Sequence, residues 1–119
     1  MEIQILKSKI HQARITGADL NYEGSLAIDL DLMDAAGILP FEKILVVNAT
    51  NGERLETYAI SAARGSGTFL LNGAAARKGM AGDVITIMVF ASMTPEEAKG
   101  FTPKKLVLDA RNRIVTRGS

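Results

Sequence analysis

The sequence contains no cysteine and only one histidine, and both scarcities exclude whole classes of function. Without thiols there is no disulfide, no thiolate metal site and no cysteine nucleophile. With His11 alone, a metal site built from several histidines is impossible within one chain. Any covalent chemistry must therefore come from other side chains or from the backbone.

A strong charge of one sign and a long apolar run are also missing. The formal net charge is +1, from 14 basic and 13 acidic residues, which is no electrostatic signature of a nucleic-acid or anionic-membrane partner. The longest apolar stretch, residues 84–91, is far too short to span a bilayer. The opening Met-Glu-Ile-Gln lacks the pattern of a signal peptide, so we expect a soluble cytoplasmic domain with no nucleic-acid or membrane partner.

What is present suits a globular enzyme or binding domain. The 119 residues are 47% hydrophobic and 23% charged, which allows one compact domain with a real core over residues 1–119. Short β-rich runs alternate with turn signals, which predicts a mainly β fold. We expect strands over residues 3–15, 26–30, 43–48, 53–60, 68–71, 84–91, 106–108 and 114–116.

The remaining segments predict turns and short helices. Residues 16–19 are expected to break the first strand, and Asn51-Gly52 is a hairpin signal. Short helices are expected over residues 31–36 and from Asn72 to near Gly79, and Thr94-Pro95-Glu96-Glu97 has the pattern of a capping box. Many short strands at close spacing favour one closed, barrel-like sheet with minor helices.

Several segments, in their order and spacing, resemble those of the aspartate 1-decarboxylase family. They are Lys9-Ile10-His11, residues 18–25 (Ala-Asp-Leu-Asn-Tyr-Glu-Gly-Ser), 34–39 (Asp-Ala-Ala-Gly-Ile-Leu), 50–54 (Thr-Asn-Gly-Glu-Arg), Glu56-Thr57-Tyr58, Arg64-Gly65-Ser66 and 72–76 (Asn-Gly-Ala-Ala-Ala). The match extends over nearly the whole chain. The extreme N-terminus, the short C-terminal tail and Val47, where some members carry a large aromatic, depart from the family pattern.

The resemblance implies a fold, an activity and an assembly. The fold would be a six-stranded double-psi β-barrel with short helices, assembled as a homotetramer with active sites between subunits. The activity would be the conversion of L-aspartate to β-alanine and CO₂ in pantothenate biosynthesis, with a covalent pyruvoyl group generated from Ser25. Cleavage between residues 24 and 25 would give a short β chain (1–24) and a longer α chain (25–119).

The Gly24-Ser25 pair can support that chemistry. Decarboxylation of an amino acid needs an electron sink for the α-carbanion, and a backbone-derived pyruvoyl group can supply it. The Ser25 hydroxyl would attack the Gly24 carbonyl, and glycine suits that position because it has no Cβ and tolerates strained backbone angles. Alone, a Gly-Ser pair is far more often an ordinary turn.

Residues 53–60 carry the next candidates. On a strand, Arg54 and Tyr58 share one face and Thr57 points to the other, although about 13 Å separates Arg54 from Tyr58 along an ideal strand. By the resemblance, Tyr58 donates the proton that quenches the carbanion and Thr57 assists processing and binds substrate. The forked guanidinium of Arg54 suits the carboxylate that is retained. Without the resemblance, Arg54 and Tyr58 would be a cross-strand surface pair.

Four further side chains and a backbone segment complete the predicted site. Lys9 would hold a second carboxylate, while His11 and Tyr22 are possible site residues that could equally be structural. Asn72 is expected to assist processing, and the backbone N–H groups of Gly73, Ala74 and Ala75 to bind substrate or a developing oxyanion. Plain helix capping by Asn72 is the alternative.

Two other readings remain open. A small swapped-hairpin DNA-binding regulator has a comparable length and strand content, but it needs clustered basic residues, and here they are dispersed along the sequence. A relative that keeps the fold without cleaving itself would be indistinguishable in sequence, because no motif reports the strain at the junction.

Overall fold

The computed structural model describes residues 1–118, which form nine strands in one mixed sheet. Along the sheet the order is β2-β6-β3-β5-β4-β7-β1-β8-β9. The strands are β1 (Ile3–Arg14), β2 (Gly17–Asp19), β3 (Ser25–Asp29), β4 (Lys43–Asn48), β5 (Arg54–Ala62), β6 (Phe69–Asn72), β7 (Val84–Met93), β8 (Lys104–Leu108) and β9 (Ile114–Gly118). The prediction of a mainly β fold is confirmed.

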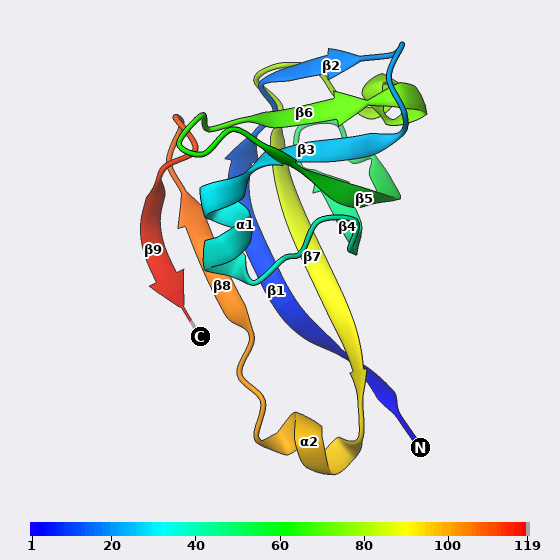
Figure 1. Ribbon diagram of the computed structural model, residues 1–119, viewed down its shortest axis with the longest axis vertical. Coiled ribbons are helices and arrows are strands. Elements are labelled where there is room, and N and C mark those ends of the chain that lie inside the picture. Colours follow the sequence, from blue (N-terminus) through cyan, green and yellow to red (C-terminus); the bar gives the residue numbers. More distant parts are fainter. Residues whose placement is uncertain (119) are drawn as a thin grey trace.

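The two longest strands, β1 and β7, project beyond the rest of the molecule as an arm (Figure 1). Helix α2 (Pro95–Lys99) closes the arm and begins with the predicted capping box. The Thr94 backbone N–H donates to the Glu97 carboxylate and, with the Thr94 side chain, holds the pKa of Glu97 below its usual value.

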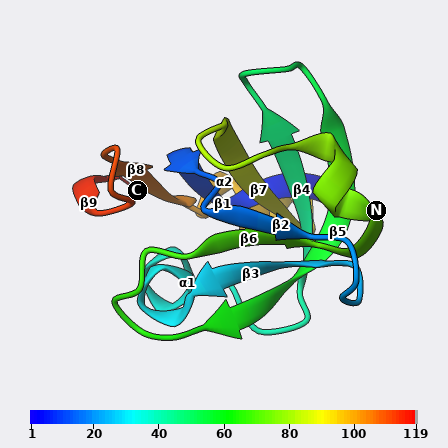
Figure 2. The same cartoon turned by 90° about the horizontal axis from the view of Figure 1, so that it is seen from above.

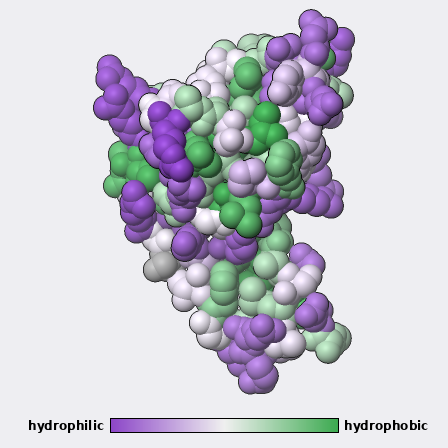
Figure 3. Space-filling view, in the orientation of Figure 1, coloured by the Kyte–Doolittle hydropathy of each residue, from purple (hydrophilic) through white to green (hydrophobic). Residues whose placement is uncertain are grey.

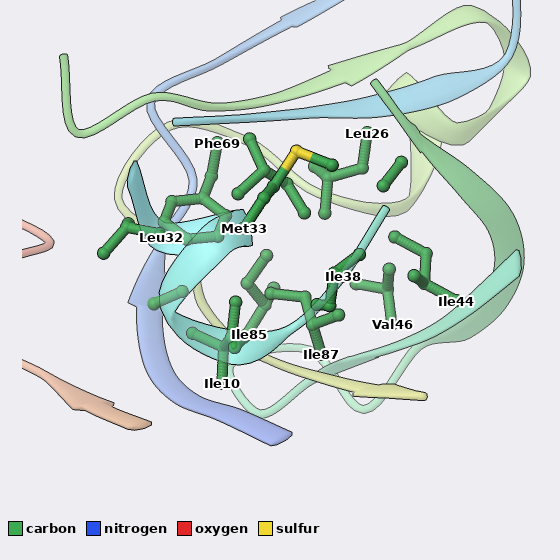
Figure 4. Packing of buried hydrophobic residues seen from close by; sticks show 14 of the residues in the cluster. Ile10, Leu26, Leu32, Met33, Ile38, Ile44, Val46, Phe69, Ile85 and Ile87 are labelled. Carbon is green, nitrogen blue, oxygen red and sulfur yellow. The ribbon is translucent and has the colours of Figure 1, made fainter. Parts of the chain in front are cut away.

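Both ends of helix α1 (Leu30–Ala36) are specified by the sequence. The Asp29 carboxylate accepts from the Asp31 backbone N–H at the first turn, and Gly37 ends the helix in the left-handed conformation. The buried side chains of the helix pack into the main core cluster, together with residues from β1, β3, β4, β6 and β7 (Figure 4).

The first strand ends at Arg14, one residue before its predicted end, but the predicted break over residues 16–19 is only partly present. Residues 17–19 form β2, parallel to β6, instead of a break. Thr16 makes this crossing possible: its backbone N–H donates to the Phe69 carbonyl, and its hydroxyl accepts from the Phe69 N–H. The chain thus passes from the ladder of β1 with β7 into a ladder with β6, at the far end of the sheet order. In Figure 2 the strands curve around a common interior.

The short helix predicted after β6 is present, but its type and its first residue's role differ from expectation. It is a 3₁₀-helix, η1 (Gly73–Lys78), and Asn72 makes no side-chain capping hydrogen bond to it. The capping alternative for Asn72 was therefore wrong, because its amide is engaged elsewhere.

Candidate active site

Ser25 is the first residue of β3 and is fully buried. Its hydroxyl donates to the Glu23 carbonyl (3.1 Å) and accepts from the Asn72 side-chain N–H (3.1 Å). Ser25 and Asn72 are also direct partners in the antiparallel ladder between β3 and β6. A buried hydroxyl held by an amide donor is thus placed immediately after the Gly24 carbonyl.

The tightest backbone approach at this junction occurs at Gly73. Its φ is +68°, and a Cβ added there would lie 2.6 Å from Gly24 N, 2.7 Å from Gly24 Cα and 2.9 Å from Tyr22 O. All three are backbone atoms, which cannot move aside as a flexible side chain can. Only glycine therefore allows η1 to begin against the junction.

Gly24 itself is not constrained in the way that the sequence suggested. Its backbone φ is not positive, and a Cβ added to it would meet nothing within 4 Å. The close contact that makes glycine necessary thus lies across the junction, at Gly73, and not at the residue before the serine. Gly24 itself lies in an exposed loop, residues 21–24.

A cavity of about 300 Å³ opens beside the junction. It brings together four of the predicted residues with three that were not predicted: Gly24, Thr57, Ala74 and Ala75, and Leu55, Glu56 and Lys78. The cavity exists because the parallel pairing of β3 with β5 begins only at Leu26 and Ala59. The preceding residues of β5 have β4 on one side and this space on the other.

Tyr58 and Thr57 project from opposite faces of β5, as predicted. Thr57 pairs with Ile44, which is buried, while Tyr58 pairs with the exposed Lys43. One residue back from the pairing of Leu26 with Ala59, Ser25 comes beside Tyr58, so the two share a face of the sheet. The Tyr58 ring also lies 6.2 Å from that of Phe41.

Three predicted residues lie on the outer face of β1, β7, β4 and β5, away from the core. His11 is hydrogen-bonded to the Thr86 hydroxyl (3.1 Å), Lys9 pairs with Met88, and Arg54 pairs with Val47. None of the three lines the cavity beside Gly24. Arg54 instead lines a shallower hollow on this outer face, with Leu45, Leu55, Glu56 and Phe90. Tyr22, in the loop before the junction, is 57% exposed.

Two features were not predicted from the sequence. Lys78 lies at the end of η1, and only the folding of that helix against β5 brings it to the cavity; no sequence signal distinguishes it from a surface lysine. The second is a gathering of cations on the hairpin of β8 and β9, with Lys104, Lys105, Arg111, Arg113 and Arg117. The expectation that the basic residues are dispersed was wrong for this hairpin. Its Asp109 has a lowered pKa because the backbone N–H groups of Arg113 and Arg111 donate to it.

Residues 1–118 include no helix long and apolar enough to cross a membrane. The same residues contain no group of three or more histidine and acidic side chains arranged to hold a metal ion.

Comparison with known proteins identifies the family. The aspartate decarboxylase family model matches residues 1–115. An aspartate 1-decarboxylase of Chloroherpeton thalassium is 56% identical over 113 residues, covering 95% of this chain and 83% of the relative. Those of Caldicellulosiruptor saccharolyticus (56% identical; 97% and 90% covered) and Phocaeicola vulgatus (54%; 97% and 100%) match similarly. The chain therefore belongs to the aspartate decarboxylase family.

Proposed function

We propose that this chain cleaves itself between Gly24 and Ser25 and then converts L-aspartate to β-alanine and CO₂, which supplies β-alanine for pantothenate synthesis. The observation that carries the proposal is the buried Ser25 hydroxyl, held by Asn72 directly after an exposed Gly24. Membership of the family supports the reaction. The cytoplasmic location expected from the sequence stays a prediction.

Self-cleavage begins with the Ser25 oxygen. It attacks the Gly24 carbonyl carbon; the C–N bond breaks, an ester forms, and the hydroxyl proton moves to the freed nitrogen. Elimination then breaks the Cβ–O bond, which leaves a carboxylate on Gly24, and one water enters as one ammonia leaves. The N–H of Asn72 stabilises charge on the oxygen as its proton departs.

The residues of the junction fit the pyruvoyl group that this reaction would leave at position 25. Ser25 lies in the ladder with Asn72, directly after Gly24, and Gly24 lines a cavity together with the small side chains of Ala74 and Ala75. A pyruvoyl carbonyl there supplies the electron sink that decarboxylation requires. Thr57, which lines the same cavity, would bind substrate and assist cleavage, and the backbone at Gly73 would leave room for both.

The proton that replaces the lost CO₂ would come from Tyr58. Its position beside Ser25, on the same face of the sheet, supports this role. Arg54 would hold the carboxylate that remains in β-alanine, because gripping the departing carboxylate would stabilise the ground state and slow the reaction. His11 and Tyr22 stay possible site residues.

We further propose a homotetramer in which a second subunit supplies the outer face. Three strands separate β1 from β3 in the sheet order, and Lys9, His11 and Arg54 do not line the cavity of their own chain. The molecule also exposes large apolar side chains between its charged groups (Figure 3). They include Leu39, Phe41, Phe90 and Phe101. Burying such groups between copies is favourable.

The six-stranded double-psi barrel is part of the same proposal. Thr16 joins the end of β1 to β6 by two hydrogen bonds, which supports closure of the sheet through β1 and β2. The hairpin of β8 and β9 would then lie outside the barrel, as a sheet extension along β1.

Intact mass measured under denaturing conditions, before and after prolonged warming, tests the proposal. We expect fragments 1–24 and 25–119, the latter lacking an α-amine and reacting with a carbonyl reagent, and release of CO₂ from L-aspartate. Ser25→Ala serves as the matched control and should stay uncut and inactive. Full decarboxylase activity in Ser25→Ala would eliminate the pyruvoyl mechanism.

A further inference from the structure

We infer that Lys78 is a substrate-binding residue that supplies, from the same chain as Ser25, a positive charge for a carboxylate of L-aspartate. The inference rests on the proposed function and adds a residue to it. Its starting point is the cavity beside the junction, where Lys78 is the only cationic group among the lining residues.

The backbone of Lys78 is fixed in place. Its carbonyl accepts from the side-chain amides of Asn48 (3.1 Å) and Asn51 (2.9 Å), which lie at the end of β4 and in the turn that follows. Asn48 is itself buried and also donates to the Asp83 carboxylate (3.0 Å). The end of η1 is therefore tied to the hairpin of β4 and β5, and the lysine side chain starts from a defined position at the cavity.

The ammonium group is held without being enclosed. Its Nζ lies 3.1 Å from the Glu53 carboxylate, and the two side chains are 43% and 47% exposed. A pair this exposed contributes little to folding stability. It does orient the lysine while leaving ammonium N–H groups available to a second anion, since Lys has three donors.

The charges around the cavity leave a need for this cation. L-aspartate carries two carboxylates, and Glu56, the only acidic lining residue, would repel them were it not paired with Lys43 at 2.9 Å. Arg54 and Lys9 do not line the cavity of this chain. A carboxylate that leaves water needs a compensating charge or hydrogen bonds, and Lys78 is the cationic residue among those that line the cavity.

Substitution of Glu53 should change substrate affinity in the direction opposite to substitution of Lys78. Its negative charge partly neutralises Lys78 at the cavity. Glu53→Gln removes that charge while keeping a hydrogen-bond acceptor for the ammonium group, so substrate should bind more tightly. A purely structural ion pair predicts the contrary, with both partners' substitutions acting in the same direction.

The test compares four variants of the full chain after intact-mass measurement of cleavage. Lys78→Met removes the charge but keeps a long side chain, Lys78→Arg restores the charge, and Glu53→Gln frees it. Arg77→Met is the matched control, because Arg77 precedes Lys78 in η1, is exposed and does not line the cavity. KM and kcat for L-aspartate are measured at low salt and at about 0.5 M salt, where such attraction is screened.

We expect Lys78→Met to raise KM about fivefold, with kcat and the rate of self-cleavage nearly unchanged. Lys78→Arg should restore the KM of the unmodified protein, and Glu53→Gln should lower KM below that value. In Lys78→Met, KM should also depend less on the salt concentration. An unchanged KM in Lys78→Met, or an equal shift in Arg77→Met, overturns the inference. If the unmodified protein fails to cleave or to decarboxylate aspartate, the proposed function itself is wrong and this inference falls with it.

Discussion

The junction at Gly24 and Ser25 and the outer face of β1, β7, β4 and β5 are built in opposite ways. At the junction, a buried hydroxyl, an amide and a closely approaching backbone come from two segments of one chain, residues 22–25 and residues 72–73. On the outer face, Lys9, His11 and Arg54 stand on a sheet surface, away from the cavity of their own chain. Under the proposed function, self-cleavage would depend on groups within one subunit, while decarboxylation would draw on a second. Substitutions in each region can show whether self-cleavage and decarboxylation depend on different residues.

The largest effect is expected from Gly73→Ala. The new Cβ would come within 2.6 Å of the Gly24 backbone, so the junction must shift. Displacement of reacting groups by about 1 Å can cost about 100-fold in rate, and we expect a slowing of self-cleavage of that order. Intact mass over time measures it.

Gly52→Ala and Gly65→Ala are the matched controls for this substitution. Both glycines also have positive φ, +80° and +75°, but a Cβ on either meets nothing within 4 Å. Each control should lower stability by about 1 kcal/mol because of its left-handed backbone, and Gly73→Ala by more because of the added backbone clash, as judged by thermal unfolding. Gly73→Ala that cleaves as fast as the two controls would show that the close approach has no part in processing.

Arg54→Ala should separate the two regions. Cleavage should proceed at the unmodified rate, whereas loss of a forked, charged contact with substrate should reduce kcat/KM for L-aspartate by about 100-fold. The decisive measurement uses chains carrying Arg54→Ala co-expressed with chains carrying Ser25→Ala, so that mixed assemblies form before cleavage. Mixed assemblies should regain activity, since one intact site can form between the two kinds of chain. No recovery, despite mixing demonstrated by native mass spectrometry, would place both residues' contributions within one subunit.

Asn72→Ala is expected to have a smaller effect, confined to the junction. It removes the only side-chain N–H that donates to the Ser25 hydroxyl among the described residues, and one such hydrogen bond corresponds to about tenfold in rate. The rate of fragment appearance tests this. If Asn72→Ala left cleavage unaffected, the amide would be serving only to fill its buried position.

His11→Gln should have the smallest effect on cleavage, less than about twofold. A glutamine can still reach the Thr86 hydroxyl, which is the hydrogen-bond partner of His11 and lies on β7, away from the junction. Its influence should appear in decarboxylation alone, as a change in kcat/KM. A cleavage rate as low as that of Asn72→Ala would mean that β1 acts on Ser25 directly.

Much of the fold could be predicted from local sequence, for physical reasons that differ among segments. Thr94 and Glu97 specify α2 by bonding to one another's backbone, and Asp29 and Gly37 specify the two ends of α1. In β5 the alternation of Arg54, Thr57 and Tyr58 follows from pleating alone. β2 could not be predicted, because Gly-Ala-Asp has little strand propensity and is held extended by its pairing with β6.

The site was less accessible to sequence analysis, because its important contacts join segments distant in the chain. Ser25 and Gly24 stand out as a pair, but their partner Gly73 is identified only by the backbone atoms that it meets. Lys78 looks like any surface lysine until η1 is folded against β5. A resemblance transfers residue types; it does not say which of them depend on exact fit and which on charge alone.

The position of residues 1–24 has a consequence for the protein after cleavage. β1 is bonded to β7 on one side and to β8 on the other, and β2 is bonded to β6. A cut before Ser25 would therefore leave two polypeptides paired within one sheet, and neither could dissociate without breaking the hydrogen bonds of several strand pairs. Unfolding would still separate them, so the mature protein would regain its structure only by a second-order encounter, and its melting temperature would rise with concentration. Self-cleavage would thus replace one chain, whose residues 1–24 and 25–119 are covalently joined while it folds, by two polypeptides that must associate before the fold can form again.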